Sequence, residues 1–115
     1  MKKELEARTK RFALSVIEFV GKLPRSKASD VIGYQLLKSG TSIGANCREV
    51  NRAQSHEDFI HKLAICETDA AETEYWPELA VEANLTGPDS AELLKEIGEL
   101  LAIFVASGRT AKAHR

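Results

Sequence analysis

The segment Lys38–Asn46 reads KSGTSIGAN and places small residues inside a pattern that is typical of a helix. Apolar and small residues recur within and around it at helical spacing, at Ile32, Leu36, Ser39, Ile43 and Val50. That spacing defines one helix face that packs against other helices. We therefore interpret Gly40, Gly44 and Ala45 as small residues that let a neighbouring helix approach closely.

The glycines of this segment do not match two motifs that bind nucleotides or DNA. A phosphate-binding loop requires a lysine directly after its second glycine, whereas Gly40 is followed by Thr41. A DNA-reading helix-turn-helix with Gly40 in its turn requires apolar residues where Asn46 and Glu49 stand. A single unbroken helix through residues 38–46 would exclude this second motif.

A helix with the same spacing precedes this segment. Pro24 ends that helix, because proline disfavours the helical conformation of the residue before it. The helix that contains KSGTSIGAN is then expected to begin near Ser29 or Asp30, since either side chain can cap a helix N-terminus. The inward positions of the preceding helix are Leu5, Thr9, Phe12, Val16, Phe19 and Leu23.

Two further helices follow. The third is expected to open at Ser55, which forms a capping box with Asp58, and to continue with a kink through Pro77. A turn at residues 86–88 precedes the fourth helix, which starts at Asp89 or Ser90 and is expected to end at residues 107–108. The inward positions of the third are Phe59, Leu63, Cys66, Ala70 and Thr73, and those of the fourth are Leu93, Ile97, Leu100, Leu101 and Phe104.

Four helices with short connections predict an all-α fold, an antiparallel up-down four-helix bundle. We predict one domain over residues 1–107 and a basic C-terminal tail over residues 108–115. Some apolar residues of the first and third helices fall outside the inward positions, which favours an oligomer. The candidate interface residues are Leu14, Ile17, Ile60, Tyr75 and Leu79.

The charges are divided unevenly along the chain. Residues 1–54 hold eleven Lys/Arg against five Asp/Glu, whereas residues 55–115 hold five against twelve. This division fits basic helices packed against acidic ones, within a subunit or between subunits, and it also fits a basic surface for nucleic acid. The candidate nucleic-acid contacts are Lys2, Lys3, Arg8, Lys10, Arg11, Lys38, Arg48 and Arg52.

The sequence predicts no catalytic, cofactor-binding or metal-binding residues. His56 and His61 are five residues apart, whereas a zinc-protease helix needs histidines four apart. No nucleophile stands with a base at a recognisable spacing, and nothing indicates a small-molecule substrate. No apolar run is long enough to span a membrane, and two cysteines, Cys47 and Cys66, fit a reducing cytoplasm better than a secreted disulfide scaffold.

Several segments in order resemble one protein family. The first is RTKRFALSVI at residues 8–17, which is followed by Leu23-Pro24. The second is QLLKSGTSIGAN at residues 35–46, and the third is SHEDFIHKLAI at residues 55–65 followed by ETEYW at residues 72–76. The chain thus resembles the four-helix-bundle family encoded in intervening sequences of bacterial 23S ribosomal RNA genes, also called the S23 ribosomal protein family.

The resemblance implies a soluble bacterial bundle that assembles as a ring-like homopentamer and has no known enzymatic activity. It also implies kinship with accessory subunits of diversity-generating retroelements, which bind a reverse transcriptase and nucleic acid through a basic pentamer surface. The chain departs from the family pattern at Thr68-Asp69, where a Lys-Glu pair is common, and at Pro77, where leucine is common.

Two functional hypotheses follow from the sequence. The first is a non-enzymatic oligomeric bundle that serves as an assembly or adaptor module, with a protein partner. The second is an RNA-binding accessory protein that uses its basic N-terminal half to neutralise phosphates.

Overall fold

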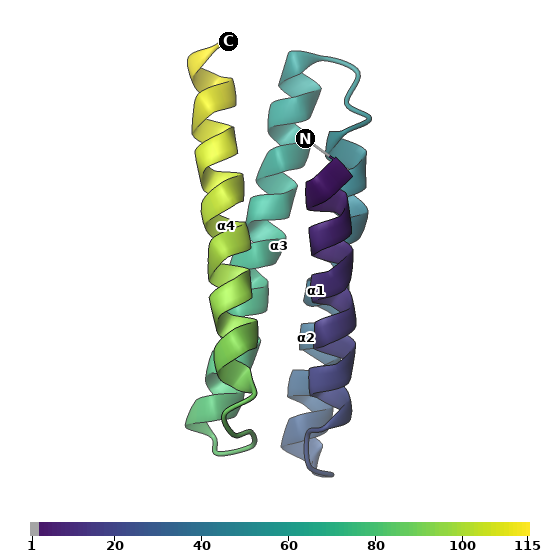
Figure 1. Cartoon of the computed structure of the whole chain (residues 1–115), viewed down its shortest axis with the longest axis vertical. Helices are drawn as coiled ribbons and strands as arrows, with labels where there is room; N and C mark the ends of the chain where they lie inside the picture. Colours follow the sequence, from purple (N-terminus) through teal and green to yellow (C-terminus); the bar gives the residue numbers. More distant parts are fainter. Residues whose placement is uncertain (1–2) are drawn as a thin grey trace.

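The computed structural model describes residues 3–115, and all of its regular elements there are helices. They are α1 (Lys3–Gly21), α2 (Lys27–Val50), α3 (His56–Glu82) and α4 (Ser90–Ala113). The helices run alternately up and down in a rod of 47 × 21 × 20 Å, so that the start of α1 and the end of α4 lie toward the same end of the rod (Figure 1). The predicted all-α up-down four-helix bundle is confirmed.

Serine side chains define where two of the helices begin. The Ser55 hydroxyl accepts a hydrogen bond from the Asp58 backbone N–H at 3.0 Å, and the Asp58 carboxylate accepts one from the Gln54 N–H. The predicted start of α3 is therefore confirmed. The predicted start of α2 at Ser29 or Asp30 is wrong, because Ser26 is the cap and its hydroxyl accepts from the Ser29 N–H at 3.0 Å.

Two helices continue through residues that often end a helix. Pro77 lies inside α3 and is buried, and α3 continues to Glu82 as predicted. The predicted end of α4 at residues 107–108 is wrong, because α4 continues through Gly108 to Ala113. Buried Ala111, whose carbonyl accepts from the His56 ring at 2.7 Å, ties this last part of α4 to the start of α3.

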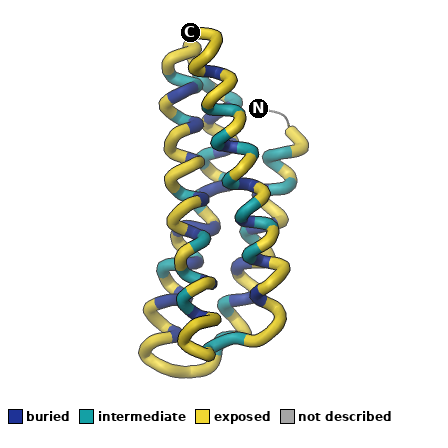
Figure 2. The backbone as a smooth tube through the Cα atoms, turned by 90° about the vertical axis from the view of Figure 1, so that its left-hand side faces the viewer, coloured by how far each residue is buried: buried dark blue, intermediate teal, exposed yellow. Residues whose placement is uncertain are grey.

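The core is a single column of side chains along the axis of the rod. Buried residues alternate with exposed ones along every helix (Figure 2). Burying each large apolar side chain of this kind stabilises a fold by roughly 1.5–3 kcal/mol. The large side chains that are almost fully buried include Phe12, Val16, Leu36, Ile43, Leu63, Ile97, Leu100 and Phe104.

Glycines bring α1 and α2 close together. A Cβ atom at Gly40 would lie 2.9 Å from Cγ2 of Val16, and one at Gly44 would lie 3.5 Å from the hydroxyl of Thr9. The predicted role of both glycines in close packing is therefore confirmed, whereas Ala45 is exposed and does not take part. Because α2 is unbroken from Lys27 to Val50, the helix-turn-helix alternative is excluded.

The helices occupy the four corners of the bundle. Each helix packs on its neighbour in the chain, and α4 returns to contact α1 less extensively than the chain neighbours contact each other. Within residues 3–115, α1 does not pack directly on α3, and α2 does not pack directly on α4. These two pairs therefore lie on diagonals, and the outward faces of α1 and α3 point to opposite sides.

Candidate functional site

Each helix has an outward stripe of residues that lies opposite its buried stripe. Two residues along a helix is about 200° of rotation, so positions displaced by two from a buried stripe face solvent. In α1, the positions two before buried Thr9, Phe12, Val16 and Phe19 are all exposed. They form, with Lys3, the outer stripe Lys3, Ala7, Lys10, Leu14 and Ile17.

The outer stripes of α1 and α2 carry basic and apolar side chains and no acidic ones. The stripe of α2 consists of exposed residues at positions 31, 34, 38, 41, 45 and 48. Large apolar side chains are well exposed on both helices, with Leu14 at 58% and Tyr34 at 63%. We refer to the basic and the large apolar residues of these two stripes together as the basic face. They are Lys3, Lys10, Leu14, Ile17, Val31, Tyr34, Lys38 and Arg48.

From Thr68 onward, the outer stripe of α3 carries acidic and apolar side chains and no basic ones. It lies opposite the buried residues Cys66, Ala70, Thr73, Pro77 and Ala80. Tyr75 at its centre is 54% exposed, and its ring meets the half-buried Trp76 edge-on at 4.9 Å between ring centroids. We refer to this stripe as the acidic face: Thr68, Glu72, Tyr75, Leu79 and Glu82.

Two of the predicted nucleic-acid contacts are paired with carboxylates in the bundle. The Arg8 guanidinium binds Glu96 at 2.7 Å and Glu99 at 2.9 Å, which clamps α1 to α4. The Arg8 hydrogen bond holds the pKa of Glu96 below its usual range. Arg48 lies 3.9 Å from Glu6.

The remaining predicted nucleic-acid contacts among residues 3–115 are exposed. Lys2 lies outside the described residues. Among residues 3–115, five of the predicted basic residues form no ion pair, and they lie on α1, on α2 and just after α2. They are Lys3, Lys10, Arg11, Lys38 and Arg52.

The predicted interface residues divide into exposed and buried ones. Leu14, Ile17 and Tyr75 are more than half exposed, and Leu79 is half-buried. Ile60 is only 7% exposed, so its placement outside the core is wrong. It continues the buried stripe of α3 three residues before Leu63, whereas the neighbouring Phe59, which was predicted to point inward, is only half-buried.

Sequence reasoning missed the exposed apolar residues of α2. Val31 is 60% exposed and lies with Tyr34 on the outer stripe. Position 34 lies two residues after the inward position Ile32 and two before the inward position Leu36. This spacing alone would have predicted that Tyr34 points outward and would have indicated the stripe. Two smaller omissions on α3 are Ile65 and Val81, which are just over a third exposed.

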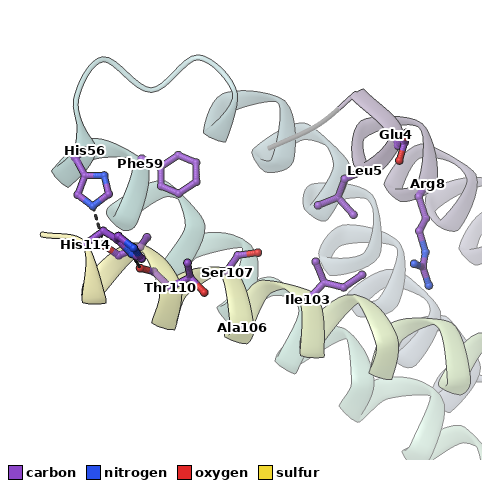
Figure 3. Close-up of a pocket in the computed structure, with 11 residues that line it drawn as sticks. Glu4, Leu5, Arg8, His56, Phe59, Ile103, Ala106, Ser107, Thr110 and His114 are labelled. Atoms are coloured by element: carbon purple, nitrogen blue, oxygen red, sulfur yellow. Dashed lines mark hydrogen bonds between the residues drawn. The ribbon is translucent and has the colours of Figure 1, made fainter.

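An apolar groove opens where the end of α4 passes the start of α1 and α3 (Figure 3). It has a volume of about 840 Å³, and its apolar lining includes Leu5, Phe59 and Ile103. The Arg8 clamp separates it from a second groove of about 490 Å³ between α1 and α4.

The polar groups of the first groove mostly bind the protein itself. The His56 ring donates to the Ala111 carbonyl at 2.7 Å, the His114 ring to the Thr110 carbonyl at 2.8 Å, and Arg8 to its two glutamates. These hydrogen bonds and ion pairs therefore hold the wall of the groove in place. The other polar side chains that line the groove are those of Glu4, Ser107 and Thr110.

The buried thiols lack the features of reactive or metal-binding groups. Burial raises the pKa of Cys66 to about 12 and also raises that of Cys47, so both stay protonated at neutral pH. Burial also raises the pKa of Asp69, whose carboxylate accepts from Asn46 at 2.5 Å and links α3 to α2. Within residues 3–115, no three His, Cys, Asp or Glu side chains gather to hold a metal ion.

The fold and its surfaces define a class: a four-helix bundle whose most distinctive features are two charged, apolar outer faces. The chain matches the sequence model of the 23S rRNA-intervening sequence protein over residues 2–106. It therefore belongs to that family. None of the helices in residues 3–115 combines the length and hydropathy needed to cross a membrane.

A solved relative shows the same fold. It is a protein of unknown function from the S23 ribosomal protein family of Bacteroides thetaiotaomicron VPI-5482. The two are 32% identical, with a TM-score of 0.84 over 95% of this chain and 99% of the other. No curated protein matches the chain. The family and this relative carry no catalytic assignment.

Proposed function

We propose that the chain is a non-enzymatic homo-oligomeric bundle that acts as an assembly or adaptor module. The observation that carries this proposal is the contrast among the outer stripes. Leu14, Ile17, Tyr34 and Tyr75 are all more than half exposed, and the bundle does not need them for its core. Leu14, Ile17 and Tyr34 lie on the basic face and Tyr75 lies on the acidic face. Large exposed apolar patches are rare on monomeric proteins and are typical of surfaces that bind another protein.

The chemistry of the interior supports a structural rather than a catalytic role. The buried thiols stay protonated, and both histidines that line the groove between α1, α3 and α4 bind backbone carbonyls. A pentamer is the assembly that the family resemblance implies, in the cytoplasm of a bacterium. Free Cys47 and Cys66 fit that compartment, where thiols are kept reduced.

Native mass spectrometry of the protein purified from its own host at low salt tests the proposal. The subunit mass is 12.7 kDa, and we expect a multiple of this mass with no nuclease-sensitive addition. The matched control is the same preparation treated with nuclease, which should leave the mass unchanged. A monomer at every concentration would contradict the proposal.

RNA binding is the second candidate function, and the basic face supports it. Lys10 and Lys38 are exposed, and neither is paired with a carboxylate within residues 3–115. Repetition of the face in an oligomer would strengthen weak phosphate contacts through avidity. The acidic face would then point away from the RNA.

Salt dependence tests RNA binding. The logarithm of the binding constant falls linearly with the logarithm of the salt concentration, with a slope of about −0.7 for each phosphate contacted on a single strand. Replacing two contacting lysines should therefore make this slope shallower by about 1.4. Fluorescence anisotropy with a single-stranded RNA would compare Lys10→Ala/Lys38→Ala with the α4 control Lys95→Ala. Absence of binding by the wild type at ~50 mM salt would remove this second candidate.

A further inference from the structure

The basic and acidic faces lie on different sides of one bundle. The acidic face belongs to α3, and the basic face belongs to α1 and α2. Because α1 and α3 occupy diagonal corners, Leu14 and Tyr75 point to opposite sides of the rod. One copy can therefore use the two faces at the same time with two different neighbours.

The faces are also chemically complementary. The basic face carries Lys10 and Lys38 around Leu14 and Tyr34, whereas the acidic face carries glutamates around Tyr75. Like charges opposite each other would repel, so neither face fits a second copy of itself. Each face offers the charges that the other lacks, together with apolar side chains for the centre of a contact.

We propose that the basic face of one copy binds the acidic face of the next, so that the chain assembles head to tail. This inference rests on the proposed function and specifies its interface. Head-to-tail contacts between unlike faces close into a ring when the rotation per copy divides a full turn. Tyr34 and Tyr75 supply aromatic side chains of the kind that concentrate binding energy at interface centres.

The outer stripe of α4 differs from the basic and acidic faces and takes no part in the proposed contact. It consists of Glu92, Lys95, Glu99, Ala102 and Ala106, all exposed. Its charges are mixed and its apolar side chains are only alanines. The head-to-tail contact therefore does not need α4, which provides a control surface on the same bundle.

Two variants that each disable one face test the proposal. Leu14→Ser/Tyr34→Ser removes the apolar centre of the basic face, and Glu72→Ser/Tyr75→Ser removes the centre of the acidic face. All these side chains are exposed, so circular dichroism and thermal unfolding should show that both variants fold. Lys95→Ser/Ala102→Ser on α4 is the matched control and should assemble as the wild type does.

Sedimentation velocity then measures each variant alone and both mixed. We expect each variant alone to be a monomer, because every contact needs one basic and one acidic face. The mixture should form a heterodimer of twice the subunit mass, since one intact face of each kind remains. This heterodimer should weaken as salt rises, because its charges are near the surface.

The outcomes separate the interface from the proposed function. A wild type that assembles while either variant still assembles alone would overturn the head-to-tail contact and leave the homo-oligomer intact. Monomeric variants whose mixture stays monomeric, where the wild type assembles, would also overturn it. A wild type that is itself monomeric would contradict the proposed function.

Discussion

The outer stripes of α3 and α4 differ although the two helices pack side by side against the same core. Both helices present a continuous row of exposed or half-buried residues opposite their buried stripe. In α4 this row is glutamate, lysine and alanine, whereas in α3 it holds Tyr75 and Leu79 between glutamates. The bundle needs only the buried stripes, so the exposed aromatic and aliphatic residues on α3 are the ones that the proposed contact with a second copy would use.

The charges on α3 point to the same conclusion. Glu74, Glu78 and Glu82 stand four residues apart, and like charges at this spacing destabilise a helix by about 0.2–0.5 kcal/mol per pair. The helix therefore accepts a small loss of stability by keeping a negative surface. In α4, Lys95 and Glu99 alternate in sign at the same spacing, as expected for a helix selected for stability and solubility.

The inner and outer rows of α4 should differ most in their effect on stability. Phe104→Ala removes a fully buried ring, so the free energy of unfolding should fall by about 3–5 kcal/mol. Ala102→Ser on the outer row should change it by no more than about 0.5 kcal/mol. Urea titration followed by circular dichroism measures both, and equal effects would refute the assignment of inner and outer rows.

Two glycines should respond to alanine with opposite signs. Gly40→Ala places a Cβ 2.9 Å from the Val16 methyl, so the free energy of unfolding should fall by about 1–2 kcal/mol. Gly108→Ala on α4 places its Cβ 4.0 Å from the nearest carboxylate oxygen, of Glu67. It should stabilise the bundle by about 0.5–1 kcal/mol, because alanine favours a helix. A stabilised Gly40→Ala variant would show that α1 and α2 can separate at little cost.

The Arg8 clamp should make stability depend on pH. The Arg8 hydrogen bond lowers the pKa of Glu96 in the folded state, so this stabilisation is present above the unfolded pKa of about 4.3. It is lost as the pH falls through the folded pKa. Glu96→Gln should therefore lower the unfolding free energy by about 1 kcal/mol at neutral pH and much less in acid. Thermal unfolding across a pH series measures this, and parallel curves for both proteins would contradict it.

The smallest expected effect on stability comes from changing one of the glutamates on α3. Glu78→Lys replaces two repulsive neighbours with pairs to Glu74 and Glu82, so the unfolding free energy should rise by about 0.5 kcal/mol. Glu78→Gln is the matched control and should give about half of this gain. Thermal unfolding in the Glu72→Ser/Tyr75→Ser background removes any contribution from assembly. A loss of stability would mean that these glutamates serve the fold itself.

The sequence was sufficient for the bundle because helical spacing alone marks the buried stripes. Phe12, Leu36, Leu63 and Phe104 all lie where that spacing places them. The end of α4 could not be predicted, since contacts between His56 and Ala111 extend it past Gly108. Local sequence carries no sign of a contact between residues so far apart.

The candidate site was predicted only in part. The exposed residues Leu14, Ile17 and Tyr75 could be recognised in the sequence, because they are apolar and lie outside the inward positions of their helices. Ile60 was misplaced because the inward stripe was started at Phe59, four residues before Leu63, whereas the buried residue is Ile60, three residues before it. The engagement of Arg8 by Glu96 and Glu99 depends on how α1 meets α4, which spacing within one helix does not determine.

Sedimentation velocity of the wild type beside Tyr75→Ala, over a range of micromolar concentrations, tests the central claim most directly. The account predicts that the wild type sediments as a multiple of 12.7 kDa and that Tyr75→Ala shifts towards the monomer with unchanged thermal unfolding. A wild type that stays monomeric at every concentration, or an assembly that Tyr75→Ala leaves intact, would contradict the claim that the acidic face binds a second copy.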